Sequence, residues 1–203
     1  MTTPSTPFIA AMQVTLDGYI LGPDGEADWV DSWADGLELL PQVDAFVLGA
    51  GMFPGYEAFW TAIREDPAAA SEWLGRDAYP REIEYARVAA ETPHLVLSST
   101  LGHVSWPTAR VVRDVDELRP LEAQPGGAVY VVGGPGLVRT LIDDELLDEI
   151  RLIVHPVALG AGTRLFDGIA RRHELNLVNT EPTPSGRVNL TYRVMTSTLA
   201  NAQ

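Results

Sequence analysis

Residues 129–140, VYVVGGPGLVRT, join an apolar run to a helical pattern through Gly133, Gly134, Pro135 and Gly136. Proline suits the first turn of a helix, where its missing N–H is not needed. Glycine lets another group approach the backbone closely, and a helix start offers free N–H groups to an anion. The stretch therefore predicts a buried strand, a tight turn and a helix.

Two interpretations of this turn stand open: a plain tight turn, or a cradle for a pyrophosphate. The Rossmann fingerprint is not met, because the third residue after Gly136 is Arg139. Two other predicted strand ends are built alike, at residues 49–51 (GAG) and 98–100 (SST). Ligands of open α/β sheets bind beyond the carboxyl ends of the strands. One dinucleotide stretched across the sheet edge would use all three ends.

The remaining sequence alternates predicted strands and helices without repeats or a linker, so one domain over residues 1–203 is expected. Apolar runs predict strands at 8–14, 44–48, 94–98, 109–113, 128–132 and 147–157. Helical patterns occupy 55–64, 80–90, 115–121 and 135–142. Residues 15–35 and 65–80 are expected to be irregular. Alternation over 174–180 and 187–195, joined by PTPSG, predicts a closing antiparallel hairpin.

Composition excludes several kinds of chemistry. The chain has 0 cysteines, and all 14 basic residues are arginines, so thiolate and Schiff-base chemistry are excluded. A net charge of -14 disfavours nucleic-acid binding. No apolar run reaches the ~18 residues of a membrane span, and a signal peptide is absent, so a cytoplasmic protein is expected. The four histidines lack metal-ligand spacing, and no metal site is predicted.

Four segments carry a family resemblance: residues 12–25 (MQVTLDGYILGPDG), 44–57 (DAFVLGAGMFPGYE), 95–101 (LVLSSTL) and 130–166, which ends in HPVALGAGTRLF. In order and spacing they resemble the dihydrofolate-reductase-like superfamily. Within it, the chain is most similar to the C-terminal reductase domain of bifunctional riboflavin-biosynthesis deaminase/reductases and its stand-alone bacterial relatives.

The resemblance implies an α/β, dihydrofolate-reductase-like fold: a mostly parallel central sheet flanked by helices, with a C-terminal antiparallel hairpin. It implies an oxidoreductase that uses NADPH, with NADH as the alternative, to reduce a small heterocycle. The leading candidate substrate is the phosphoribosylamino-uracil of riboflavin biosynthesis. Relatives are commonly dimers, so a homodimer is expected.

The resemblance also implies cofactor contacts at the three strand ends. These are Gly49, Gly51, Met52, Ser98, Ser99, Thr100, Gly133, Gly134, Gly136 and Leu137. Asp17 and Tyr19 would face the substrate, and Asp28 and Trp29 would lie on a loop that closes over it. Asp17 or Asp28 is the candidate catalytic carboxylate, with a pKa raised by burial.

Aromatic residues cluster in two segments beside the predicted site. Trp29, Phe53 and Tyr56 are candidates for stacking on a substrate ring. Phe59 and Trp60 are expected to pack in the core.

The chain departs from the family pattern at two places. Where the family often has Gly-Arg-x-Thr, residues 49–52 read GAGM, so the choice between NADPH and NADH stays open. The basic residue that often follows Leu-Asp-Gly is Tyr19 here. An acidic protein without that positive charge is poorly suited to bind a sugar phosphate. Three alternatives therefore remain: a dihydrofolate, pterin or flavin reductase on the same fold, a non-catalytic nucleotide- or flavin-binding module, and a structural dimer whose pocket is inactive.

Overall fold

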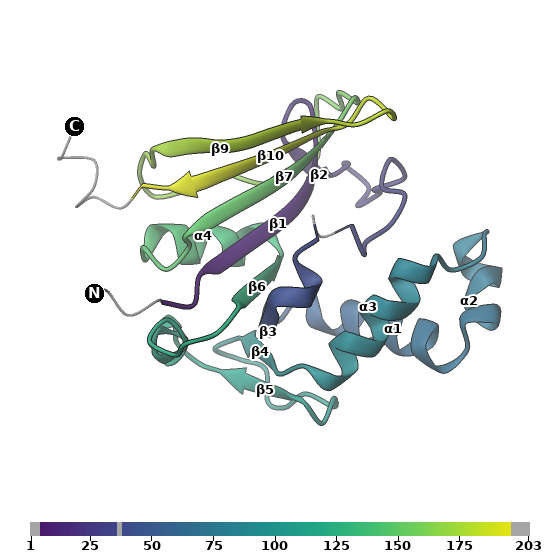
Figure 1. The fold of residues 1–203 in the computed structure, drawn as a ribbon, viewed down its shortest axis with the longest axis horizontal. Coiled ribbons are helices and arrows are strands. Elements are labelled where there is room, and N and C mark those ends of the chain that lie inside the picture. The colour runs from purple at the N-terminus through teal and green to yellow at the C-terminus, as the bar shows by residue number, and fades with distance from the viewer. Residues whose placement is uncertain (1–4, 36–37, 196–203) are drawn as a thin grey trace.

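The computed structural model describes residues 5–35 and 38–195 and is built around one eight-stranded sheet (Figure 1). The strand order is β5-β4-β3-β6-β1-β7-β10-β9. The strands are β1 (Phe8–Thr15), β3 (Val43–Gly49), β4 (His94–Leu97), β5 (Ala109–Val112), β6 (Ala128–Gly133), β7 (Glu149–His155), β9 (Leu175–Pro182) and β10 (Val188–Val194). Two short strands, β2 (Tyr19–Leu21) and β8 (Thr163–Arg164), form a separate antiparallel pair.

The sheet is parallel from β5 to β7 and antiparallel at its C-terminal edge. β1 pairs with β6 and β7, β3 with β6 and β4, and β4 with β5, all in parallel. β10 runs antiparallel to both β7 and β9. The central strands β1, β3 and β6 are continuous apolar runs because both of their faces are covered. The predicted parallel sheet with a closing hairpin is confirmed.

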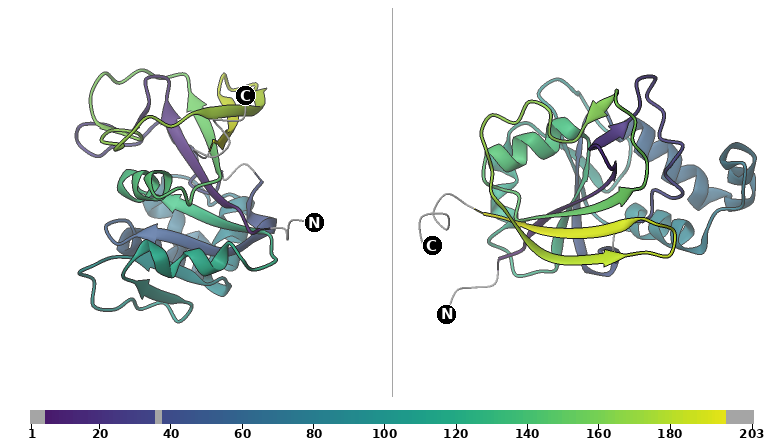
Figure 2. Two further views of the ribbon diagram at one scale, coloured as in Figure 1. Left: turned by 90° about the vertical axis from the view of Figure 1, so that its left-hand side faces the viewer. Right: turned by 90° about the horizontal axis from the view of Figure 1, so that it is seen from above.

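Helices cover both faces of the sheet (Figures 1 and 2). On one face α1 (Phe53–Glu65) and α3 (Pro80–Glu91) pack with Phe46, Val96 and Tyr130 in an aromatic-rich core. On the other face α4 (Pro135–Asp143) packs against a largely aliphatic core from β1, β3, β6 and β7. The β9–β10 hairpin, drawn in yellow, extends beyond these helices at the sheet edge.

Residues 65–80 were expected to be irregular, and this prediction is wrong for their first half. A helix, α2 (Pro67–Leu74), begins there. The carboxylate of Asp66 accepts hydrogen bonds from the amides of Ala68 and Ala69, and Pro67 occupies the first turn. Gly75, at φ 68°, ends the helix in the left-handed conformation. The capping residues at both ends carried the signal that the short apolar pattern lacked.

Three smaller differences lie in the connections. The predicted helix at 115–121 is a pair of 3-10 turns, Val115–Glu117 and Arg119–Leu121. The predicted loop at 15–35 contains β2. The predicted strand at 147–157 is shorter as β7, and it ends at His155 because the next residue is Pro156. No helix within the described residues combines the length and apolar character needed to cross a bilayer.

Candidate functional site

The three predicted strand ends lie together at one edge of the sheet. β4, β3 and β6 are adjacent parallel strands, with Gly49 opposite Leu97 and Leu48 opposite Gly133. Parallel neighbours bring their carboxyl ends to the same edge. The prediction that these ends share a rim is therefore confirmed.

The glycines of this rim differ in what surrounds them. A Cβ atom built on Gly51 or Gly134 meets no atom within 4 Å. At Gly133, where φ is +130°, a Cβ would lie 3.1 Å from Cε of Met12. Gly133 is thus required by the backbone of the turn, whereas Gly51 and Gly134 leave open surface that a ligand can approach. Gly134 is also the N-cap of α4, so the unpaired amides of the helix start follow it directly in the chain.

A cavity of about 630 Å³ opens on this surface, and we call it the aromatic cavity. Its aromatic wall consists of Trp33, Tyr56, Phe59, Trp60, Tyr85 and Tyr130. Of the predicted site residues it is lined by Gly49, Gly51, Met52, Tyr56, Gly134, Gly136 and Leu137. Phe59 and Trp60, expected only to pack in the core, also line it. A planar ring of nicotinamide or substrate size fits such a wall.

Ser98 and Ser99 line a second cavity of about 620 Å³, which we call the arginine cavity because Arg113 and Arg119 also line it. Nη1 of Arg113 donates to the carbonyls of Ser98, at 2.9 Å, and Leu101, at 2.6 Å. Both arginines come from the segments that follow β5. Asp114, Asp116 and Asp144 line the same cavity, so three carboxylates stand beside its two guanidinium groups.

Asp17 occupies a different environment from the one expected. Its carboxylate accepts hydrogen bonds from Thr15 Oγ1 at 2.7 Å and from the amides of Leu159 and Gly160 at 3.0 and 2.8 Å. The Thr15 hydroxyl and these amides lower the pKa of Asp17 to about 2. The expectation of a pKa raised by burial is wrong for Asp17. Its carboxylate instead ties the turn after β1 to the segment after β7.

The other predicted substrate-facing residues are dispersed. Tyr19 is buried in β2, where its hydroxyl accepts a hydrogen bond from Arg164 at 3.0 Å. Phe53 packs edge-on against Trp106 in the core. Neither side chain lines the aromatic cavity.

Asp28 and Trp29 also lie away from the lining of the aromatic cavity. Asp28 is exposed, whereas the sequence prediction placed it in a buried site. Trp29 is half-buried, and its Nε1 is buried without a hydrogen-bond partner within the described part of the chain. Thr100 and Gly133 complete the strand ends without lining either cavity.

A buried chain of hydrogen bonds supports the aromatic wall. The hydroxyls of Tyr56 and Tyr85 lie 3.2 Å apart, and the Tyr56 hydroxyl lies 3.2 Å from Nε2 of His94. Nδ1 of His94 lies 2.8 Å from the carbonyl oxygen of Thr92. Burial lowers the pKa of His94 to about 4, so the ring is neutral at neutral pH.

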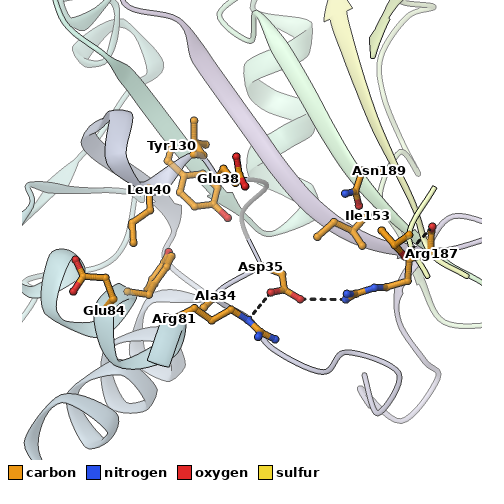
Figure 3. Close-up of a pocket in the computed structure, with 13 residues that line it drawn as sticks. Ala34, Asp35, Glu38, Leu40, Arg81, Glu84, Tyr130, Ile153, Arg187 and Asn189 are labelled. Atoms are coloured by element: carbon orange, nitrogen blue, oxygen red, sulfur yellow. Dashed lines mark hydrogen bonds and ion pairs between the residues drawn. The ribbon is translucent and has the colours of Figure 1, made fainter. Parts of the chain in front are cut away.

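A third cavity, of about 360 Å³, adjoins the aromatic cavity and shares Asp35, Tyr85 and Tyr130 with it (Figure 3). Asp35 bridges two arginines there: Oδ1 lies 2.7 Å from Nε of Arg81, and Oδ2 lies 3.1 Å from Nη1 of Arg187. We call this arrangement the arginine clamp. It joins the loop before β3 to α3 and to the β9–β10 hairpin.

Sequence reasoning missed the polar residues of the aromatic cavity. Gln13 donates to the Ser32 carbonyl at 2.7 Å, and its Oε1 lies 2.9 Å from Nε2 of His155. Gln13 is a polar residue inside an apolar strand, which was the available signal. Tyr85 and Tyr130 gave no such signal, since aromatic residues in a helix and a strand are typical of cores.

The family model of the RibD C-terminal domain matches residues 7–188. The uncharacterized protein YyaP of Bacillus subtilis (strain 168) is 31% identical over 187 residues, which cover 91% of this chain and 93% of YyaP.

Two solved structures share the fold at low sequence identity. One is a diaminohydroxyphosphoribosylaminopyrimidine deaminase/5-amino-6-(5-phosphoribosylamino)uracil reductase from Thermotoga maritima (17% identity, TM-score 0.59, 94% of this chain and 57% of that chain). The other is dihydrofolate reductase from Enterococcus faecalis, complexed with NADP(H) (17% identity, TM-score 0.55, 94% of this chain and 97% of that chain). The fold is therefore dihydrofolate-reductase-like, as expected.

Proposed function

Because the chain belongs to the RibD C-terminal domain family, we propose that it is an NAD(P)H-dependent reductase of the riboflavin-biosynthesis type, acting on a small heterocyclic substrate. One observation carries the proposal: the bare glycine rim of the sheet opens directly into the aromatic cavity. Hydride transfer requires two rings held in contact and shielded from water, and it requires no nucleophile.

The residues present fit a nicotinamide dinucleotide. Open space at Gly51 and Gly134 and the amide groups at the start of α4 suit a pyrophosphate. The aromatic cavity suits the nicotinamide, and the arginine cavity, with Ser98, Ser99 and Arg113, suits the adenosine end. When bound, the cofactor supplies the hydride.

The chain itself would bind, orient and shield the two rings. The aromatic wall excludes water and fixes ring orientation by stacking. Asp17 stays ionised at neutral pH because its pKa is about 2, so it is not the proton donor of the proposed reaction. Its role in this proposal is to hold the loop around Tyr19 in place.

A thermal-shift titration tests the function. NADPH at 100 times its dissociation constant should stabilise the protein by ~2.7 kcal/mol, and NADH serves as the matched comparison. A preference for NADPH that disappears in Arg113→Gln would support the arginine cavity as the 2′-phosphate site. Absence of any shift with either nucleotide would contradict the proposed function.

A flavin ligand is the second candidate, favoured by the number of aromatic rings that line one cavity. FMN belongs in the same titration. Stabilisation by FMN without stabilisation by NADPH or NADH would favour a flavin-binding module over a nicotinamide-dependent reductase.

A further inference from the structure

The tyrosine hydroxyl protons of the aromatic wall are used in hydrogen bonds within the protein. A carbonyl oxygen can only accept, so Nδ1 of His94 must carry the proton that it donates to Thr92. The neutral His94 ring then offers Nε2 only as an acceptor. Tyr56 must therefore donate its proton to His94, across 3.2 Å.

The direction of the hydrogen bond between Tyr85 and Tyr56 follows from that of the bond between Tyr56 and His94. Since the Tyr56 proton is used by His94, the hydrogen bond between the two hydroxyls, at 3.2 Å, runs from Tyr85 to Tyr56. Burial raises the pKa of both tyrosines, so both hydroxyls keep their protons. The chain runs in one direction, from Tyr85 through Tyr56 and His94 to the Thr92 carbonyl. Oη of Tyr85 is left with lone pairs and no spare proton.

Tyr130, which lines the same cavity, is oriented similarly. Its hydroxyl donates to the carbonyl of Ala11 at 3.5 Å, a longer and weaker contact (Figure 3 shows the Tyr130 side chain). The tyrosine hydroxyls of the wall thus present hydrogen-bond acceptors.

The charged groups that line the aromatic cavity also do not favour an anionic ring. Asp35 is its one charged residue within the described part of the chain, and both carboxylate oxygens of Asp35 are held by the arginine clamp. The clamp arginines line the adjoining cavity, and each of them is paired with one oxygen of Asp35. Away from the glycine rim and the start of α4, an anionic ring would therefore meet tyrosine lone pairs and no arginine among the residues that line the aromatic cavity.

We propose that the aromatic cavity selects an uncharged heterocycle whose ring edge carries an N–H donor, and that Oη of Tyr85 accepts the hydrogen bond from it. Tyr85 is the specificity-determining residue, and Tyr56 and His94 are positioning residues that fix the direction of its proton. This inference rests on the proposed function, since the selected ring is the hydride acceptor. It narrows that function to substrates bound through an N–H edge.

Two matched probes test the inference: 2-aminoquinazoline, which presents an N–H donor, and 2-methoxyquinazoline, which presents only acceptors. Both are uncharged at mildly alkaline pH. Their dissociation constants would be measured by quenching of tryptophan fluorescence, since Trp33 and Trp60 line the aromatic cavity. In the unmodified protein the amino probe should bind at least ~10-fold more tightly, because the methoxy oxygen would face an acceptor.

Two variants separate specificity from packing. Tyr85→Phe removes the acceptor and should bring the two dissociation constants within about threefold of each other. Tyr56→Phe keeps the Tyr85 hydroxyl but removes its internal acceptor, so the Tyr85 proton can turn toward the cavity. The methoxy probe should then gain affinity relative to the amino probe. Tyr192→Phe, on β10 and outside the cavity, is the control and should leave the ratio unchanged.

Stabilisation by NADPH, measured on every variant, shows whether the fold and the proposed function are retained. Equal binding of both probes to the unmodified protein would overturn the inference, as would a ratio that Tyr56→Phe leaves unchanged. Either result, obtained with NADPH stabilisation intact, leaves the reductase proposal standing. Loss of the NADPH effect in the unmodified protein would count against the reductase proposal instead.

Discussion

Gly133 and Gly134 are neighbours at the end of β6, and the structure requires them for different reasons. A side chain on Gly133 would strain a backbone at φ +130° and press on Met12. A side chain on Gly134 would enter open space in the aromatic cavity. The first glycine serves the turn, and the second is free to serve a ligand.

This difference predicts opposite outcomes for two substitutions. Gly133→Ala should lower the free energy of unfolding by ~1–3 kcal/mol, measured by urea denaturation. Gly134→Val should change it by less than ~1 kcal/mol and should abolish the thermal shift produced by NADPH, because the valine blocks approach to the backbone. A normal NADPH shift in Gly134→Val would contradict the assignment of the rim.

The buried ring of His94 should make the free energy of unfolding depend on pH. Burial lowers the pKa of its ring from 6.5 to about 4 in the folded protein. Between these values the unfolded chain binds more protons than the folded one, so stability falls as the pH falls from about 6.5 toward 4. By about pH 5 the loss should amount to roughly 2 kcal/mol.

Urea denaturation at several pH values measures this dependence. His94→Gln should flatten the curve by that amount, whereas His103→Gln, at an exposed position, should reproduce the original curve. Identical pH dependence in both variants would show that His94 does not titrate as the buried hydrogen-bond chain requires. Burial also lowers the pKa of His155, so some dependence of the same sign should remain in His94→Gln.

At the scale of elements, a buried carboxylate on α3 forms hydrogen bonds that hold the loop beside the aromatic cavity in place. Glu82 of α3 is 1% exposed and accepts hydrogen bonds from Arg76 at 2.7 Å, Ser32 at 2.8 Å and the amide of Tyr79 at 2.8 Å. Ser32 immediately precedes Trp33, which lines the cavity. The position of this wall therefore depends on a buried carboxylate one helix away.

Removing that carboxylate should destabilise the protein. Glu82→Gln removes the charged partner of Arg76, whose remaining hydrogen bonds go to the carbonyls of Asp31 and Asp77, and should lower the free energy of unfolding by about 3 kcal/mol. Glu84→Gln is the matched control on the same helix. Its partner is Arg87, both side chains are 55% exposed, and the expected change is within ~0.5 kcal/mol. Equal effects of the two substitutions would refute the anchoring role of Glu82.

At the scale of the molecule, β9 is a terminal strand of the sheet. Leu177 and Val178 on it are 48% and 50% exposed, and an open edge strand with apolar side chains favours pairing with another chain. The homodimer implied by the family resemblance stays a prediction, and this edge is where we expect it. Light scattering should give twice the 22.0 kDa chain mass, and Val178→Lys should reduce it to the monomer mass. A monomer at all concentrations would contradict the expectation.

The sequence by itself determined the architecture, because the evidence for it is local. Apolar runs, alternation and Gly-Pro turns each specify an element, and the parallel order brings the three strand ends to one edge. It also determined which glycines and serines stand at that edge. Helix α2 was not predicted because its apolar pattern is short, although its capping residues were present in the sequence.

Only the tertiary structure decided which side chains face the ligand cavities. Asp17, predicted to be catalytic, bonds to amides more than 140 positions away in the chain, and no local pattern reveals such partners. Arg113 and Ser98 meet because β4 and β5 are neighbours. The direction of the Tyr85–Tyr56–His94 hydrogen bonds depends on three elements packing together. Spacing along the chain specifies elements, whereas contact, burial and proton direction arise only when distant elements meet.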